Sequence, residues 1–250
     1  MNRLFLSVAA ILIASPAVAA DMARPVMKAP MAAPVMSWTG CYIGAGGGYG
    51  MWNQDVVEFV SGVPGTVTQT GGGRGWFGTA QVGCDYQLSS NWVIGAFGDW
   101  DFMDIKGTPH FAVDAAGNEK ERWAWSVGAR LGYLIAPHVL TYVSGGYREA
   151  HFDRVDLFNE FLPTSSLDRS IPAHSYTGWF IGSGFEYGLS WFPGLFLKTE
   201  YRYAQFSADR LTEFVTSTGA ATTTSFDSKK FEQTIRTELV WRFNWGRAAY

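Results

Sequence analysis

The feature that most restricts the fold of this chain is a period-two alternation of apolar and polar side chains that recurs in eight segments. In one of them, Trp123, Val127 and Leu131 alternate with Ser126 and Arg130. Such alternation places successive side chains on opposite faces of a β-strand. We therefore predict eight strands, near residues 38–53, 74–87, 92–104, 122–135, 139–149, 175–189, 195–206 and 230–243, of which the fifth is ambiguous in phase.

The connections between these segments alternate strictly in length, which predicts an all-β, up-and-down antiparallel barrel. Short turns on one side and long loops on the other are typical of a transmembrane barrel. Eight strands could also close a soluble, lipocalin-like barrel, so the face that points outward has to be decided separately. We expect short turns near residues 88–91, 136–138 and 190–194, and long polar loops near residues 54–73, 105–121, 150–174 and 207–228.

The aromatic residues favour the membrane barrel. The chain has 18 Phe, 11 Tyr and 11 Trp, and on the apolar faces these rings gather at the strand ends. Aromatic belts at both ends mark the two interfaces of a membrane, so the apolar face should point outward to lipid. The predicted girdles are Trp76, Trp100, Trp123, Trp125, Trp179 and Tyr203 on the long-loop side, and Tyr86, Trp92, Tyr133, Tyr187, Trp241 and Phe243 on the turn side.

The first twenty residues have the three parts of a cleaved export signal. Arg3 supplies the positive charge, residues 4–14 are apolar, and small residues at 18–20 precede Asp21. The apolar part is too short to span a bilayer as a helix. We predict a signal peptide at 1–20, a Pro/Ala-rich periplasmic tether at 21–37 and a barrel at 38–250; outer-membrane material whose intact mass retains residues 1–20 would contradict the cleavage.

The inward faces are predicted to carry charges of both signs. The interior of an eight-stranded barrel is just wide enough for side chains, so these charges should pair and fill it. The two interpretations left open are a salt-bridged plug and a narrow pore. The expected lumen network is Asp85, Asp99, Asp101, Arg130, Glu186, Lys198, Glu200, Arg202, Glu232, Arg236, Glu238 and Arg242.

The same charges predict the register of the last two strands. Placing Glu200 opposite Arg236 also places Lys198 opposite Glu238, which gives two pairs of opposite charge. A slip of two residues in either direction brings like charges together, which is unfavourable. We expect both pairs to be cross-strand ion pairs, unless bulges or diagonal contacts decide the register instead.

The two cysteines lie on one outward face of the first predicted hairpin. Folding the hairpin about the middle of its loop brings Cys41 and Cys84 nearly opposite each other. The compartment is oxidising, so a disulfide can form, but the geometry between adjacent strands is demanding. A disulfide and two free thiols are therefore equally weighted hypotheses.

Three motifs carry a family resemblance: WTGCYIG at 38–44, Ser-Gly-Gly at 144–146 and LKTEYRY at 197–203. With them the whole chain resembles the small alphaproteobacterial outer-membrane immunogenic proteins. The resemblance implies an OmpA-like, eight-stranded outer-membrane barrel that contributes to envelope integrity, is sometimes described as a porin, and has no catalytic residues. Two departures are Cys41, where the family usually has an aromatic residue, and a chain that continues past Phe243. We place the end of the assembly signal at Phe243 rather than Tyr250.

The sequence offers little support for other chemistry. The histidines, at 110, 138, 151 and 174, have no metal-ligand spacing, although some relatives of the family are thought to bind haem. His174 and Ser175 could belong to a barrel hydrolase, but a neighbouring pair without a third group is weak evidence. The net charge of −3 excludes a broad basic field for nucleic acid. We therefore expect no cofactor, no metal site and no enzyme.

The hypothesis from the sequence is a structural outer-membrane barrel that supports the envelope and displays surface loops. The alternatives are a narrow porin for small solutes, and a loop-borne binder of a ligand, haem or a host surface. The expected partners are outer-membrane lipid and lipopolysaccharide, together with the barrel-assembly machinery during biogenesis. The sequence does not name a partner for the loops.

Overall fold

The computed structural model describes residues 37–112, 114–159 and 161–244. The predicted signal peptide and all of the predicted tether before Ser37 lie outside the described residues, as does Tyr250. In the described part of the chain, no helix is long and apolar enough to cross a membrane.

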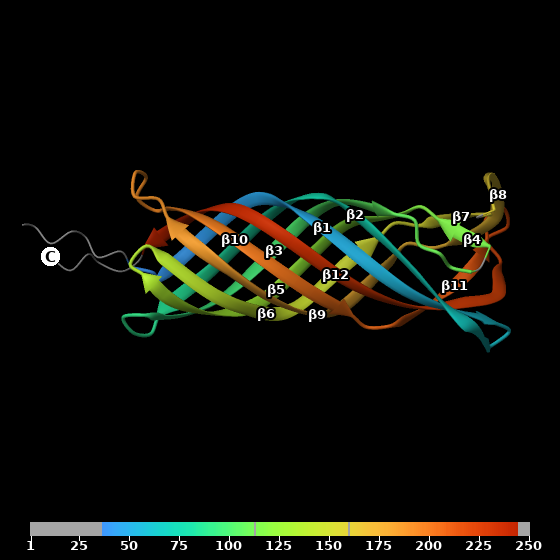
Figure 1. The fold of residues 1–250 in the computed structure, drawn as a ribbon, viewed down its shortest axis with the longest axis horizontal. Helices are drawn as coiled ribbons and strands as arrows, with labels where there is room; N and C mark the ends of the chain where they lie inside the picture. Colours follow the sequence, from blue (N-terminus) through green and yellow to red (C-terminus); the bar gives the residue numbers. More distant parts are fainter. Residues whose placement is uncertain (1–36, 113, 160, 245–250) are drawn as a thin grey trace, which may run out of the picture. The chain divides into compact units, whose positions relative to one another are not determined.

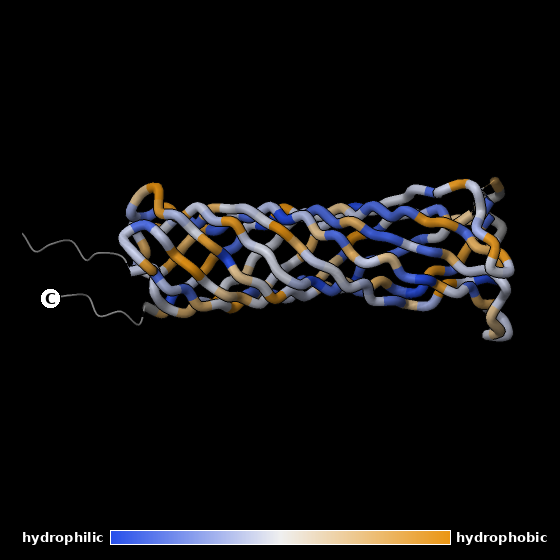
Figure 2. Tube along the Cα trace, turned by 90° about the horizontal axis from the view of Figure 1, so that it is seen from below, coloured by the Kyte–Doolittle hydropathy of each residue, from blue (hydrophilic) through white to orange (hydrophobic). Residues whose placement is uncertain are grey.

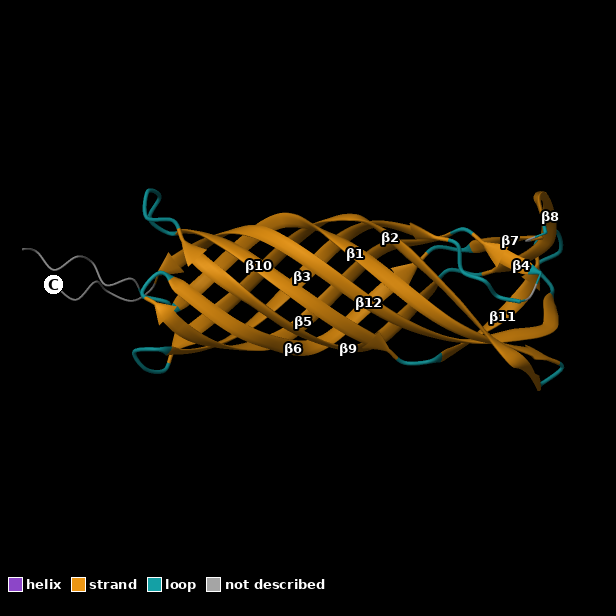
Figure 3. Cartoon of the chain, viewed as in Figure 1, coloured by secondary structure: helices purple, strands orange, loops and turns teal. Residues whose placement is uncertain are grey.

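Eight antiparallel strands form a closed ring, which confirms the predicted architecture (Figure 1, Figure 3). The ring closes where β1 pairs with β12 from Gly40 opposite Asn244 to Val60 opposite Thr224. Closure satisfies the backbone of both terminal strands and leaves no exposed edge. In ring order the strands are β1 (Gly40–Val60), β2 (Val63–Gln87), β3 (Trp92–Gly107), β5 (Glu119–Ala136), β6 (Val139–Phe152), β9 (His174–Gly188), β10 (Leu195–Phe206) and β12 (Ala221–Asn244).

Four further strands lie at one end of the ring, which we call the loop end (Figure 1). They are β4 (Ala115–Gly117), β7 (Val155–Asn159), β8 (Leu162–Ile171) and β11 (Asp209–Val215). The other end, called the turn end, carries the short connections β2–β3, β5–β6 and β9–β10, close to the predicted positions. Long connections are present at residues 150–174 and 207–228, as predicted, but much of each is paired strand.

The largest correction concerns the predicted loop at 54–73. Here β1 and β2 continue as one long hairpin whose turn is Ser61-Gly62, with φ angles of 51° and 82°. The polar composition suggested a loop, but alternation continues through it, with Gln54 and Val56 buried and Asp55 half-buried. A strand that extends past a membrane is wetted on its outer face, so it can carry polar side chains there without losing its pairing.

The apolar face of the ring points outward and the charged face points inward. Outward-facing Trp76 is 72% exposed and Ile135 is 63% exposed, whereas inward-facing Asp101 is 0% and Arg148 1% exposed. Figure 2 shows hydrophilic residues concentrated in the half of the barrel that leads to the loop end. This reversal of the usual soluble pattern is what a barrel surrounded by lipid requires.

β6, whose phase the sequence left ambiguous, faces the lumen with Leu140, Tyr142, Ser144 and Arg148. All four are buried, while Val143 is 56% exposed on the outer face. The ambiguity arose because Gly145 and Gly146 interrupt the alternation, and a glycine has no side chain that reports its face. The register with β5 and β9 decides the phase instead.

A disulfide joins Cys41 on β1 to Cys84 on β2, near the turn end. The two residues are direct partners in the register, and their Cα atoms are 3.9 Å apart. Of the two hypotheses for the cysteines, the structure has the bridged one.

Replacing both cysteines by serine should lower the free energy of unfolding by about 2–4 kcal/mol, because the bond closes a loop between residues 43 apart in the sequence. Urea unfolding of refolded protein, followed by tryptophan fluorescence, measures the difference. Adding a reductant should destabilise the native protein by a similar amount and leave the C41S/C84S variant unchanged. Equal stability of the native protein and the variant would contradict this prediction.

Candidate functional site: the charged lumen

The twelve charged residues predicted for the lumen all lie inside the ring, on β2, β3, β5, β9, β10 and β12. None of them is more than 7% exposed. Because six strands contribute side chains to one narrow space, residues far apart in the sequence become neighbours. The charges form three connected layers along the barrel.

The layer nearest the turn end is a ring of two arginines and two carboxylates. Arg130 donates hydrogen bonds to Asp85 and, over 3.1 Å, to Glu186. Arg242 donates to the same two carboxylates, each over 2.7 Å. The ring of Tyr42 lies within 4.9 Å of both guanidinium groups. Charges balance in this layer, and aromatic faces cover the cations.

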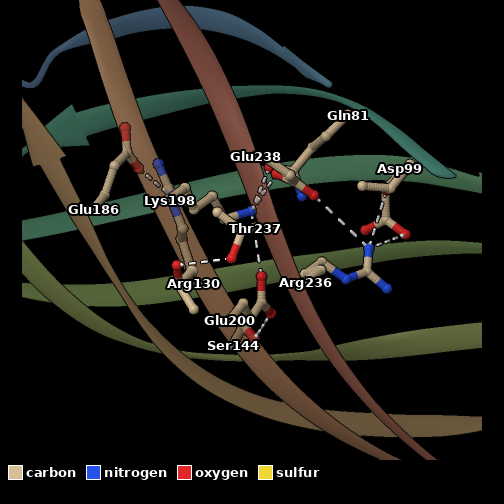
Figure 4. A network of polar contacts seen from close by, with 12 residues as sticks. Gln81, Asp99, Arg130, Ser144, Glu186, Lys198, Glu200, Arg236, Thr237 and Glu238 are labelled. Carbon is tan, nitrogen blue, oxygen red and sulfur yellow. Dashed lines mark hydrogen bonds and ion pairs between the residues drawn. The ribbon is translucent and has the colours of Figure 1, made fainter. Parts of the chain in front are cut away.

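The middle layer is centred on Glu200 (Figure 4). Its carboxylate accepts hydrogen bonds from Ser144 over 2.7 Å, from Tyr142 over 3.2 Å and from Arg202 over 2.7 Å. The ammonium group of Lys198 lies 3.2 Å away. Four charged or polar groups around one buried carboxylate offset the cost of removing Glu200 from water, so paired charge occupies the centre of the lumen.

The predicted register of the last two ring strands is confirmed. Glu200 on β10 lies opposite Arg236 on β12, and Lys198 lies opposite Glu238. The Lys198 ammonium is 3.3 Å from the Glu238 carboxylate, as expected.

The predicted ion pair between Glu200 and Arg236 is wrong. Arg236 reaches across the lumen and donates to Asp101 over 3.1 and 2.9 Å, while Glu200 is taken by Arg202. The interior is narrow enough for a long guanidinium side chain to reach the opposite wall. Register therefore fixes which residues face each other, but not which charges pair.

The layer nearest the loop end contains Arg148, which the sequence interpretation missed. It donates two hydrogen bonds to Glu232, of 2.7 and 2.8 Å, and one each to Asp101 and Ser126, both of 2.9 Å. The available signal was that Arg148 lies at a multiple of two residues from the inward-facing residues of β6. The ambiguous phase of that strand hid this signal. Arg148 links the layers, because Asp101 also binds Arg236.

Beyond Arg148, the ammonium group of Lys230 is held between the aromatic rings of Trp52 and Phe152, at 4.2 and 4.0 Å from their centroids. It donates hydrogen bonds of 2.6 Å to Gln54 and to Glu119. The sequence interpretation missed this cluster because Gln54 and Glu119 fell in predicted loops. Only the continuation of β1 and β5 past those boundaries brings them into the lumen.

His151 on β6 and His174 on β9 are near each other in the register but have different partners. His151 stacks on Trp123 at 4.9 Å and contacts the Ser175 hydroxyl at 2.9 Å, whereas His174 contacts Asp209 at 3.1 Å. His174 and Ser175 thus point to different partners. Among the described residues, no cluster of His, Cys, Asp or Glu is arranged to hold a metal ion.

The loop end also carries exposed ion pairs, such as Arg122 with Asp153. Three hydrogen bonds of 2.8 to 3.0 Å join them. The hydrogen bonds from Arg122 lower the pKa of the Asp153 carboxyl below its usual value. This carboxylate therefore stays ionised at neutral pH.

Replacing Gly182 by alanine should lower the free energy of unfolding by about 1–3 kcal/mol, because the middle layer leaves no room for a methyl group. A Cβ atom there would lie 2.6 Å from the Ser144 hydroxyl and 2.8 Å from the Glu200 carboxylate. Gly98→Ala is the matched control, since its Cβ would meet only a backbone oxygen at 3.6 Å. Urea unfolding of both variants in detergent tests this; equal effects would contradict it.

Comparison with known proteins tests the family resemblance. No family model matches the chain. A protein named 31 kDa outer-membrane immunogenic protein from Brucella melitensis is 31% identical over 256 residues, covering 97% of this chain and 100% of the relative. The chain belongs to this family of outer-membrane immunogenic proteins. A relative of the same name from Brucella suis matches equally well.

The solved structures support the fold. The outer membrane protein OprG from Pseudomonas aeruginosa aligns with a TM-score of 0.54 at 12% identity, covering 82% of this chain and 97% of OprG. Family and fold together place the protein in the outer membrane, with its apolar wall in lipid. Residues of both predicted girdles lie on that wall, for example Trp76 and Trp100 toward the loop end and Tyr86 and Trp92 toward the turn end, all of them exposed.

Proposed function

We propose that the protein is a structural barrel that supports the cell envelope, displays the strands and loops of its loop end at the cell surface, and keeps its lumen closed. The observation that supports this is the burial of the lumen charges. A water-filled channel would expose charged side chains along its length, yet here arginines and carboxylates pair across the whole width of the ring.

The mixed sign of the lumen also argues against a constitutive porin. Porin channels are polar and filled with water, and rings of charged side chains in a channel select ions of one sign. In this barrel Lys198 and Arg202 share the carboxylate of Glu200, and the carboxylates of Glu238 and Asp99 balance the remaining positive charge. Opening a path would require breaking several buried ion pairs together, and this favours rare openings over steady conductance.

The proposed partners follow from this role. The outer wall contacts outer-membrane lipid and lipopolysaccharide, and the barrel-assembly machinery inserts the chain during biogenesis. The role needs no cofactor and no catalytic group. The loop end offers the surface through which a ligand or host partner would be contacted.

Two measurements test the proposal. Purified wild-type protein in planar lipid bilayers should show little current and only rare openings, whereas steady, large conductance would overturn the closed lumen. A deletion strain should become more sensitive to detergent and to EDTA, and the wild-type gene should restore resistance. Unchanged sensitivity would overturn the structural role.

A further inference from the structure

The outer wall of the barrel carries a row of three cations just beyond the aromatic girdle of the loop end. Arg74 on β2 lies directly opposite Lys106 on β3, and Lys106 lies directly opposite Lys120 on β5. All three face outward; the side chains of Lys106 and Lys120 are 65% and 32% exposed. Like charges in direct opposition on neighbouring strands repel each other, so such a row needs a compensating anion.

The protein itself compensates only part of this positive charge. Asp104 lies 3.0 Å from the Lys106 ammonium and 2.6 Å from that of Lys120. Arg74 has no ion-pair or hydrogen-bond partner among the described residues, and nearby Arg122 is already engaged by Asp153. Three cations therefore share one carboxylate, and two positive charges remain uncompensated.

Two hollows in the outer wall lie on either side of Lys106. One, of about 330 Å³, is lined by Gly72, Gly73, Arg74 and Lys106 among others. The second, of about 430 Å³, is lined by Lys106, Gly107 and Lys120 among others. Arg74 and Lys106 border the first hollow, and Lys106 and Lys120 border the second, which Glu119 also lines.

The height of the row on the barrel identifies the environment. Trp76 lies two residues from Arg74 on the same face of β2 and is 72% exposed; Phe102 lies four residues from Lys106 on β3 and is 64% exposed. Aromatic residues of this kind sit at the level of the lipid headgroups. The cations one step farther out therefore meet the headgroup layer of the outer leaflet, which is built from phosphorylated glycolipid.

We propose that Arg74, Lys106 and Lys120 form a binding site for the phosphate groups of lipopolysaccharide, with one phosphate in each hollow and Lys106 shared between them. Arginine and lysine both bind phosphate through charge-assisted hydrogen bonds, and the two hollows suit a headgroup that carries two phosphates. Elsewhere at the loop end, Arg210 and Arg154 have carboxylate partners in Asp227 and Asp156, and Lys229 lies opposite Asp55 in the register. The three neighbouring cations of the β2–β3–β5 wall have only Asp104.

The site rests on the placement of the barrel in the outer membrane and not on the closed lumen. A conducting barrel would overturn the proposed function and leave this site untouched. Failure of lipid binding would overturn the site and leave the closed lumen untouched.

The test compares the binding of bis-phosphorylated lipid A and of its dephosphorylated form to the folded protein in detergent micelles, by native mass spectrometry. The variant R74Q/K106Q/K120Q should bind bis-phosphorylated lipid A about tenfold to a hundredfold more weakly than wild type, because each cation near an anionic surface adds to the affinity. The matched control R154Q/R210Q/K229Q removes the same charge from positions with a carboxylate partner or neighbour and should bind normally. Migration of folded and heated samples in SDS gels shows whether each variant is folded.

Three results would overturn the site: equal losses in both triple variants, no loss in either, or equal binding of dephosphorylated lipid A to the wild-type protein. A fourth arm adds inorganic phosphate at millimolar concentration to the wild-type complex. Retention of lipid A supports a glycolipid site, whereas complete displacement would assign the cations to free phosphate and overturn the lipid assignment.

Discussion

Replacing Arg148 by alanine is expected to lower the free energy of unfolding by about 3–5 kcal/mol, because removal of one partner leaves an uncompensated charge inside the barrel. Glu232 would lose both hydrogen bonds from Arg148, of 2.7 and 2.8 Å, and with them its ion pair in the lumen. Asp101 would keep only Arg236. Urea unfolding in detergent, followed by tryptophan fluorescence, measures the loss.

Two further variants show whether the effect comes from buried charge. Arg122→Ala removes an exposed bidentate arginine from the same half of the barrel and should cost less than about 1 kcal/mol, since exposed pairs contribute little. The double variant R148A/E232A should recover much of the stability that R148A loses, because the carboxylate that lost its ion pair is removed as well. A loss for R148A no larger than that for R122A would refute the account of the lumen as a network of obligatory pairs.

Replacing Lys198, Glu200 and Arg202 together by alanine is expected to convert a nearly silent barrel into a steady, cation-selective channel. These side chains fill the middle layer, and their removal leaves Glu238 and Asp99 without one cation each. The variant removes two positive charges and one negative charge, so the widened lumen has an excess of carboxylate. Rings of carboxylates favour cations.

The matched control is L197A/T199A/Y201A, which truncates the alternate residues of the same strand. These side chains face outward, so the control changes the lipid contact and leaves the plug intact. Current in planar bilayers should rise several-fold for the inward variant and stay at the wild-type level for the outward one. An inward variant that remains silent would show that other layers close the lumen.

The twelve-residue lumen network shows how far the sequence could be interpreted. A period of two assigns every residue of a strand to one of two faces, so the inward position of residues such as Asp85 and Arg242 follows once the strands are recognised. The register between β10 and β12 could also be predicted, because only one alignment avoids like charges. Both conclusions depend on local rules that a single sequence contains.

The strand ends could not be predicted in the same way. Outside the membrane both faces of a strand carry polar and apolar residues, so the contrast between faces fades although pairing continues, as in β1 from Gln54 to Val60. The Lys230 cluster lies in that region and was missed for that reason. The sequence left the Cys41–Cys84 disulfide undecided for a different reason. An error of two residues in the strand register is enough to separate two cysteines that could otherwise form a bond.

The sequence by itself determined the eight-stranded ring, its orientation toward lipid and twelve of the charged residues in its lumen, because these depend on alternation and on where aromatic residues stop. Only the tertiary structure decided which charges pair. Arg236 binds Asp101 across the lumen instead of Glu200 beside it, and Arg148 binds both Glu232 and Asp101. The physical reason is the width of the ring: closure brings opposite walls within reach of one arginine side chain, and sequence order carries no information about that distance.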